Sequence, residues 1–270
     1  MGIQHAEPGE MISVVDFDPA LCAARRTLYR FAAWTLADSR CGSWDRLSLA
    51  STAQLVSEAA AVIRDEPAAR AHTLGLGERP LADLDPAIVL AKLPATAEAA
   101  NAAYEQTFGL LVSSNCPPYE TEYIDSKFAF QRSHALADIA GFYRAFGLEP
   151  SALRPERQDH LALELEFMAS LLGLEQAAAE GDHPDRMERR AVCADAGHSF
   201  LEKHLISWVP TFAHLLSRQG PGGFYDAVSR YLAALVAAER AMAGLVVSSA
   251  RVMPSTVERP EECAGCLLST

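Results

Sequence analysis

Acidic side chains and a histidine crowd the segment RQDHLALELEFM, residues 157–168. Asp159, His160, Glu164 and Glu166 fall within eight residues, and such groups serve as general acids, general bases or metal ligands. Asp159 and His160 could act as acid–base partners, but the sequence provides no accompanying nucleophile, metal set or cofactor motif. Asp159 suits the N-cap of a helix, where its carboxylate accepts hydrogen bonds from first-turn amides and meets the positive end of the dipole. We therefore expect a capped helix here and no catalytic residues.

A pair of cysteines near the end of the sequence also has ligand chemistry. Cys263 and Cys266 form one Cys-x-x-Cys pair, which can provide half of a zinc site or a redox disulfide. A structural zinc site needs about four ligands, and no second pair of this kind exists. His198 and His204 could join it, although their spacing of six places them on nearly opposite faces of a helix. We therefore expect no metal site and no bound cofactor, and keep a metal- or redox-active protein as an alternative.

Charge and composition restrict the partners and the location of the protein. The formal net charge is −12 and half of the residues are apolar, as in globular proteins. No basic patch is visible, so nucleic acid is not an expected partner. The acidity permits a cationic partner, or serves solubility alone. Glu239 and Arg240 interrupt the best candidate for a membrane span, and the first twenty residues lack the features of a secretory signal. We expect a cytoplasmic protein without stable membrane insertion.

Helices are the only elements that the sequence predicts. Ala and Leu are abundant, and long runs without Gly or Pro favour helices. Asp18 and Pro19 suit the start of the first helix, and Gly147 suits the end of a long middle helix. Arg25 and Arg26 are expected on a solvated helix face. The predicted helices cover approximately residues 19–37, 51–65, 95–111, 126–146, 159–180, 184–207 and 224–247.

The fold class that follows is all-α. Short loops between the helices favour antiparallel neighbours in a single globular bundle of roughly seven to ten helices. The expected helical domain covers residues 18–250 and contains a connector near 147–158. Residues 1–17 are expected to form an N-terminal extension, and residues 251–270 a loose C-terminal tail.

The helix that starts near Asp159 is expected at the centre of the bundle. Its apolar residues form two stripes on nearly opposite faces, and a helix that is apolar on two sides is normally buried. Glu164 lies between the stripes, so we expect it to be partly buried and to need a donor or a positive charge. The stripes consist of Leu161, Leu165, Met168 and Leu172, and of Leu163, Phe167, Leu171 and Leu174.

Four segments of the sequence together resemble a known family. DHLALELEFM, which begins at Asp159, is similar to the signature of the TorD/DmsD/NarJ family of redox-enzyme maturation chaperones. CPPYETEY (residues 116–123) resembles that family's loop before the long middle helix, and ADIAGFYRAFGL (137–148) resembles the helix itself. FLEKHLISWVPTF (200–212) matches its F-x-x-x-H-L-x-x-W-x-P-x-F pattern. The resemblance covers approximately residues 20–248.

The resemblance implies a cytoplasmic, all-helical, TorD-like chaperone that is not an enzyme. Members of the family bind the twin-arginine leader or N-terminal segment of the catalytic subunit of a molybdenum oxidoreductase. They hold this apo-subunit until its cofactor is inserted and before its export. CPPYETEY most resembles the branch that serves enzymes of the dimethyl-sulfoxide-reductase type. Members of the family can exchange helices between protomers, so a monomer and a helix-swapped homodimer are both open for this chain.

The resemblance also implies a set of peptide-binding residues. In the family the Asp-His pair of the signature takes part in leader recognition, which points to Asp159 and His160. The other implied residues lie in the matched loop, on the central helix and in the fourth motif; they are Tyr119, Glu120, Glu122, Tyr123, Glu164, His204 and Trp208. Carboxylates can hold the guanidinium forks of a twin-arginine leader, and an apolar groove can hold the segment that follows.

One departure from the family's pattern lies directly before the Asp-His pair. The family commonly has a proline there, whereas this sequence has Arg157 and Gln158. An arginine at this place would oppose an arginine-rich ligand. Two alternatives to a chaperone stay open: a metal- or redox-active helical protein that uses Cys263 and Cys266, and a structural accessory subunit of the oxidoreductase.

Overall fold

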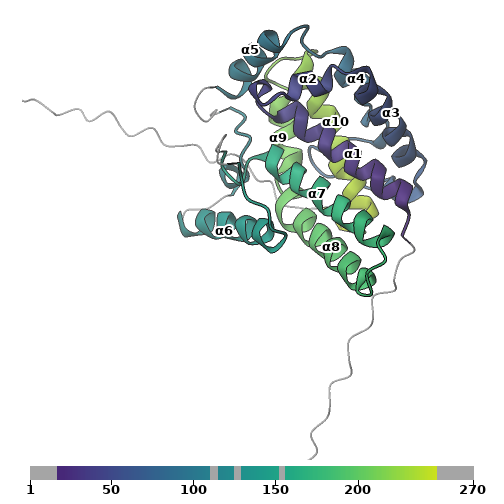
Figure 1. Cartoon of the computed structure of the whole chain (residues 1–270). Helices are drawn as coiled ribbons and strands as arrows, with labels where there is room; N and C mark the ends of the chain where they lie inside the picture. The colour runs from purple at the N-terminus through teal and green to yellow at the C-terminus, as the bar shows by residue number, and fades with distance from the viewer. Residues whose placement is uncertain (1–16, 110–114, 125–128, 152–155, 248–270) are drawn as a thin grey trace, which may run out of the picture.

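A computed structural model describes residues 17–109, 115–124, 129–151 and 156–247 of the chain. Within these ranges the chain forms ten α-helices and no β-strand, which confirms the predicted all-α class (Figure 1). The helices are α1 (Pro19–Leu36), α2 (Ser43–Leu47), α3 (Ala50–Asp65), α4 (Pro86–Ala91), α5 (Ala97–Phe108), α6 (Ala129–Ala145), α7 (Leu161–Glu180), α8 (Arg186–Phe200), α9 (Val209–Leu216) and α10 (Phe224–Met242). Short 3₁₀ turns occur at Ser39–Cys41, Pro67–Ala69, Leu81–Asp83 and Glu120–Tyr123, and a π-helical turn follows α8 at Leu201–Leu205.

The predicted central helix, α7, packs against α1 on one side and α8 on the other (Figure 1). The first apolar stripe of α7 is buried at Leu161, Leu165 and Met168, so this face of the helix does not contact solvent. The second stripe is buried at Phe167 and Leu171 but ends in solvent, where Leu174 is 42 % exposed. Behind α1 and α7, α10 packs against α9 and is buried along most of its length.

The predicted helix ends are confirmed where local chemistry sets them. The carboxylate of Asp18 accepts hydrogen bonds from the backbone N–H groups of Ala20 (2.8 Å) and Leu21 (3.1 Å), and Pro19 opens α1. Gly147 follows α6 with a φ of 68°, in the left-handed region that glycine adopts without strain. The N–H of Leu148 then reaches back to the carbonyl oxygen of Tyr143 (2.9 Å), which closes the helix.

Other boundaries differ from the prediction. The helix expected over 184–207 ends at Phe200 and continues as the π-helical turn. The helix α9 then starts at Val209 with Pro210 in its first turn. A proline can end the helix before it, but it also fits a first turn, because the N–H that it lacks has no partner within the helix there. The short helices α2 and α4 were not predicted, since five or six residues show little periodicity.

The expectation that Arg25 lies on a solvated face is wrong. Its guanidinium is paired with the carboxylate of Glu239 on α10 at 2.6 Å, and only a quarter of the Arg25 side chain is exposed. The reason is that the Glu239 side chain is fully buried, and a buried carboxylate requires a positive partner.

No helix in the described part of the chain combines the length and the apolar character needed to cross a membrane. The predicted tail, with Cys263 and Cys266, and all but the last residue of the predicted N-terminal extension lie outside the described residues.

Candidate functional site

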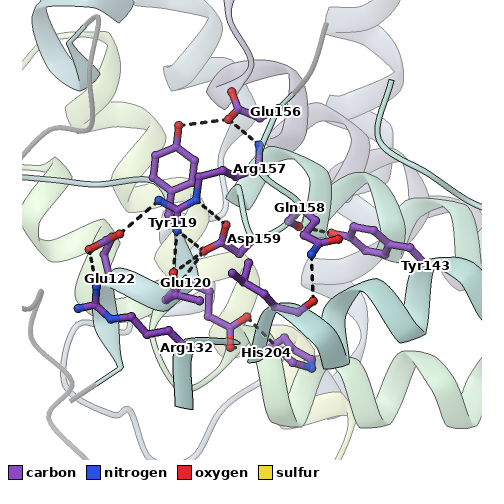
Figure 2. A network of polar contacts seen from close by, with 12 residues as sticks. Tyr119, Glu120, Glu122, Arg132, Tyr143, Glu156, Arg157, Gln158, Asp159 and His204 are labelled. Carbon is purple, nitrogen blue, oxygen red and sulfur yellow. Dashed lines mark hydrogen bonds and ion pairs between the residues drawn. The ribbon is translucent and has the colours of Figure 1, made fainter. Parts of the chain in front are cut away.

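Two segments that are far apart in the sequence meet at the start of α7. The loop 116–123 runs antiparallel to the residues that precede this helix, and Tyr119 pairs with His160 in an isolated β-bridge. The backbone N–H of Glu120 donates to the carbonyl oxygen of Asp159 at 3.0 Å. The loop motif and the Asp-His motif therefore form one site, which Figure 2 shows from close by.

The side chain of Asp159 is fully buried and accepts hydrogen bonds from both segments. Its Oδ2 atom accepts from the backbone N–H of Thr121 (3.2 Å) and from the Thr121 hydroxyl (2.7 Å). The Arg157 guanidinium donates to both carboxylate oxygens, from Nε to Oδ1 at 3.0 Å and from Nη2 to Oδ2 at 2.8 Å. The prediction that Asp159 caps α7 is therefore wrong, because these donors already occupy its carboxylate.

His160 is the residue that caps α7. Its Nδ1 atom accepts a hydrogen bond from the backbone N–H of Ala162 at 3.1 Å. Burial lowers the pKa of His160, which keeps the ring neutral and Nδ1 free to accept. The Nε2 atom is buried and has no hydrogen-bond partner among the described residues. The ring also lies edge-on to Tyr119, with centroids 5.2 Å apart.

The guanidinium of Arg157 is held on several sides at once (Figure 2). Besides Asp159, it donates to the hydroxyl of Thr121 at 2.7 Å and to Oε1 of Glu122 at 3.3 Å. Its central carbon lies 4.2 Å from the centre of the Tyr119 ring, a cation–π contact. Burial acts to lower the pKa of Arg157, but the hydrogen bonds and charges of Asp159 and Glu122 raise it above its ordinary value. We call Asp159, Thr121, Glu122 and Tyr119 the guanidinium cage.

Neighbouring residues hold the cage in position. The Tyr119 hydroxyl donates to Oε1 of Glu156 at 3.2 Å, and burial raises the pKa of Tyr119 above its ordinary value. The second carboxylate oxygen of Glu122 lies 3.7 Å from Nη1 of Arg132 on α6. The side-chain amide of Gln158 donates to the carbonyl oxygen of Leu136, also on α6, at 3.1 Å. Of the two residues that stand where the family commonly has a proline, Arg157 therefore lies in the cage and Gln158 forms a hydrogen bond to α6.

A second group of acids lies around His204, where the side chain of Glu120 is buried and that of Asp138 is exposed. The ring nitrogens of His204 lie 3.0 Å from a carboxylate oxygen of Glu120 and 3.1 Å from one of Asp138 on α6. Burial raises the pKa of Glu120, and the hydrogen bond and charge of His204 oppose that rise. Glu164 was expected to be partly buried beside a donor or a positive charge. It is fully buried, and neither of its carboxylate oxygens has a hydrogen-bond partner among the described residues. Burial raises the pKa of Glu164 well above its ordinary value, and the carboxylates of Glu120 and Asp159 raise it further.

The nine predicted site residues lie in one region of the molecule, but at different depths. Tyr123 and Trp208 pack against each other with ring centroids 5.0 Å apart, and both belong to the core. Seven of the nine side chains are buried, while those of Tyr119 and Glu122 are partly exposed. Whether these residues contact a peptide stays a prediction. The buried ones are covered by other side chains of the protein, as the carboxylate of Asp159 is by Arg157.

Sequence reasoning missed two members of the site. Thr121 lies inside the CPPYETEY motif but has an ordinary polar side chain, and its hydrogen bonds to Asp159 and Arg157 appear only in the folded structure. Asp138 lies on a predicted helix that gave no sign of contact with His204. Within the described ranges, no group of three or more His, Cys, Asp or Glu side chains is placed to hold a metal ion.

Comparisons with known proteins place these motifs in one family. The family model for the nitrate reductase delta subunit matches residues 77–214, which is more than half of the chain and includes every predicted site residue. The perchlorate reductase assembly chaperone protein of Dechloromonas aromatica (strain RCB) is 39 % identical over 80 residues, 29 % of this chain and 33 % of the relative. The selenate reductase assembly chaperone protein of Thauera selenatis is 33 % identical over 113 residues, 42 % of this chain and 55 % of the relative.

A third relative, the chaperone protein TorD of Aliivibrio salmonicida (strain LFI1238), is 28 % identical over 116 residues, 43 % of this chain and 50 % of the relative. The chain thus spans between a third and just over half of the length of these three relatives. No solved structure matches the chain. By its family model and its relatives, the chain belongs to the nitrate reductase delta subunit family, the TorD/DmsD/NarJ-type chaperones that its four motifs resemble.

Proposed function

We propose that this chain is a cytoplasmic maturation chaperone for the catalytic subunit of a molybdenum oxidoreductase. It binds the twin-arginine leader or N-terminal segment of the apo-subunit and assists cofactor insertion and assembly before export. The observation that carries the proposal is the guanidinium cage, in which Asp159, Glu122 and Tyr119 surround the head group of an arginine side chain. The names of the relatives, which are assembly chaperones of perchlorate and selenate reductases, support the same role.

The chemistry of the cage fits the basic part of such a leader. A carboxylate receives a guanidinium through two parallel hydrogen bonds, and an aromatic face adds a cation–π contact, so arginine is preferred over lysine. The formal charge of −12 favours the approach of a basic segment, because complementary fields raise association rates.

The apolar part of the leader requires a different surface. The partly exposed ring of Phe142, at the end of α6, lies against His204, and the partly exposed ring of Phe146 follows in the turn after the helix. Tyr123 and Trp208 do not contribute directly, since both side chains are fully buried. An amphipathic helix that lies along the end of α6 would place its basic turn at the cage and its apolar turns on these rings.

A calorimetric titration tests the proposal. We expect the purified protein to bind a twin-arginine leader peptide from the molybdoenzyme encoded beside it. A matched peptide with both arginines replaced by lysine should bind about tenfold or more weakly, because a bidentate guanidinium contact is lost. Failure of the leader to bind, together with failure of the apo-subunit to co-purify, would refute the proposal.

The family's description as a delta subunit favours one second candidate, a structural accessory subunit that stays with its enzyme. The two roles differ in the mature complex. A chaperone leaves the enzyme after cofactor insertion, so we expect it in complexes with the apo-subunit and not in the purified, cofactor-loaded enzyme. A stoichiometric band of this chain in the mature enzyme would favour the accessory subunit.

A further inference from the structure

The guanidinium cage is already filled by a side chain of the same molecule. Arg157 uses Nε and Nη2 on Asp159, Nη2 on Thr121 and Nη1 on Glu122, and places its flat face against Tyr119. These contacts cover the edge and one face of the guanidinium, as in the binding of an arginine from a partner. The cage therefore already holds one guanidinium group, that of Arg157.

Among the described residues, the place that Arg157 occupies is the one through which an external arginine could reach Asp159. The Asp159 side chain has no exposed surface and that of Glu122 is 14 % exposed, whereas that of Arg157 is 37 % exposed. On the protein side, Thr121 and the backbone of the loop enclose the carboxylate. Arg157 therefore covers the side of the cage that faces solvent.

The cage is not stable when empty. Removing Arg157 leaves a buried carboxylate without its positive partner, which is costly in a protein interior. A second guanidinium restores that partner, so the favoured process is an exchange of one arginine for another. The remaining contacts of the cage do not involve Arg157, since Thr121 still donates to Asp159 and the backbone of Glu120 still bonds to its carbonyl oxygen.

We infer that Arg157 is an internal stand-in for an arginine of the bound peptide, and that the peptide binds by displacing it from the cage of Asp159, Thr121, Glu122 and Tyr119. This inference rests on the proposed function, because it names the contact that the leader arginine makes. It also gives Arg157 a role in selectivity. A ligand must offer a guanidinium group to replace that of Arg157. It must also form further contacts with the protein, because Arg157 is part of the same chain and competes at a high effective concentration.

The first test uses the variant Arg157→Ala and a small probe, methylguanidinium. We expect millimolar methylguanidinium to raise the melting temperature of the variant and to leave that of the wild type unchanged, because only the variant has an open cage. Methylammonium at the same ionic strength controls for charge and should have little effect on either protein. If methylguanidinium shifts neither protein, or shifts both equally, the cage does not bind an external guanidinium and the inference is wrong.

The second test measures the leader peptide on the same variant. In the wild type, the peptide can bind only those molecules in which Arg157 has left the cage, and this lowers the apparent affinity. The cage of Arg157→Ala is always open, so this variant should bind the peptide on the order of tenfold more tightly than the wild type. The matched control is Arg132→Ala, which removes an equal charge beside Glu122 but leaves Arg157 on Asp159. We expect its affinity to stay within about twofold of the wild type, since the displaced group is unchanged.

The outcomes separate this inference from the proposed function. Weaker or equal peptide binding by a folded Arg157→Ala variant would make Arg157 a structural ion pair only. If no form of the protein binds the peptide but methylguanidinium stabilises the variant, the cage is an arginine site and the proposed function fails. If Arg157→Ala does not fold alone, Arg157→Gln replaces it, and failure of methylguanidinium to restore folding or stabilise either variant overturns the inference.

Discussion

Glu164 is a carboxyl group in the interior of the bundle, one turn after the helix cap His160. Its side chain is fully buried, and the carboxylates of Glu120 and Asp159 act on it electrostatically. Burial and like charge both disfavour the ionised form, which is why the pKa of Glu164 is raised well above its ordinary value. Glu164 therefore remains a neutral acid over part of the pH range in which an exposed glutamate is charged.

The variant Glu164→Gln should have a flatter dependence of stability on pH. Between the pKa of an unfolded glutamate, about 4.3, and the higher pKa of Glu164, the folded protein holds the extra proton. Stability therefore falls as pH rises through that window. Glutamine is neutral throughout and removes this contribution. The lowered pKa of His160 has the opposite effect on stability, because it reduces the free energy of unfolding below about pH 6.5. His160 is present in both proteins, so its contribution cancels when their stabilities are compared.

Urea denaturation at pH 5 to 9 measures this effect. The stability of Glu164→Gln relative to the wild type should increase with pH across the window. Glu188→Gln, on the exposed surface of α8, is the matched control and should not change the slope. Parallel stability curves for Glu164→Gln and the wild type would show that Glu164 ionises alike in the folded and unfolded chain.

Among the helices, α6 depends on a cluster of aromatic rings for its attachment. Phe167 of α7 contacts Tyr143 of α6 and Phe146, which directly follows α6, with ring centroids 5.0 and 5.9 Å apart. It also contacts Phe200 of α8 at 4.8 Å. The other end of α6 is more exposed, and the Phe130 side chain there is 58 % exposed. The α6 helix carries Arg132 and Asp138, so its position also places two charged groups of the site.

Replacing the central ring should release α6 before the rest of the bundle. We expect Phe167→Ala to lower the free energy of unfolding by about 3–5 kcal/mol, because a buried aromatic ring is lost and a cavity remains. Hydrogen exchange in α6 should increase more than in α1 or α10. Phe130→Ala is the control and should cost no more than about 0.5 kcal/mol. If hydrogen exchange increased equally in α6 and α10, α6 would not detach independently of the rest of the bundle.

Across the whole molecule, buried ion pairs connect α10 to distant parts of the chain. Glu239 accepts from Arg25 of α1 and from the hydroxyl of Tyr29 at 3.1 Å. The next residue, Arg240, donates to Glu78 at 2.6 Å and to the carbonyl oxygen of Thr73 at 2.8 Å. Burial acts to lower the pKa of Arg25, and the charge of Glu239 raises it above its ordinary value. These pairs fix both the α1–α10 contact and the loop before η3 (Leu81–Asp83).

The variant Glu239→Ala should be among the most destabilising single changes in the protein. It leaves Arg25 and Tyr29 without their acceptor, and removing one partner of a buried pair costs about 3–5 kcal/mol. Arg79→Ala is the comparison, since it breaks the largely exposed Arg79–Asp83 pair and should cost less than about 1 kcal/mol. Thermal and urea unfolding measure both. If both variants lowered the free energy of unfolding by similar amounts, burial of Glu239 would not strengthen its ion pair with Arg25.

The features that sequence reasoning predicted correctly depend on neighbours in the chain. Asp18 and Pro19 start α1, Gly147 ends α6, and the apolar stripes of α7 place it in the interior. Caps, turns and periodicity act over one or two turns of helix, so the residue types alone specify them. Where a local rule had two meanings, as for Pro210, the prediction was wrong because the same proline can end one helix or begin another.

The site depended on contacts that no local pattern specifies. Asp159 has a side chain that could cap a helix, but its carboxylate accepts hydrogen bonds from Thr121 of the loop 116–123 and from Arg157. His160 therefore caps α7 instead. A side chain forms hydrogen bonds with the groups that surround it, and those groups can come from distant segments, as in the pair of Arg25 and Glu239, which are 214 residues apart. The sequence alone specified a helical bundle of one family and the residues that gather at its site. The tertiary structure decided which of them are buried, which partners they hold, and that the guanidinium cage is filled by Arg157, because burial and long-range pairing arise only when the helices pack.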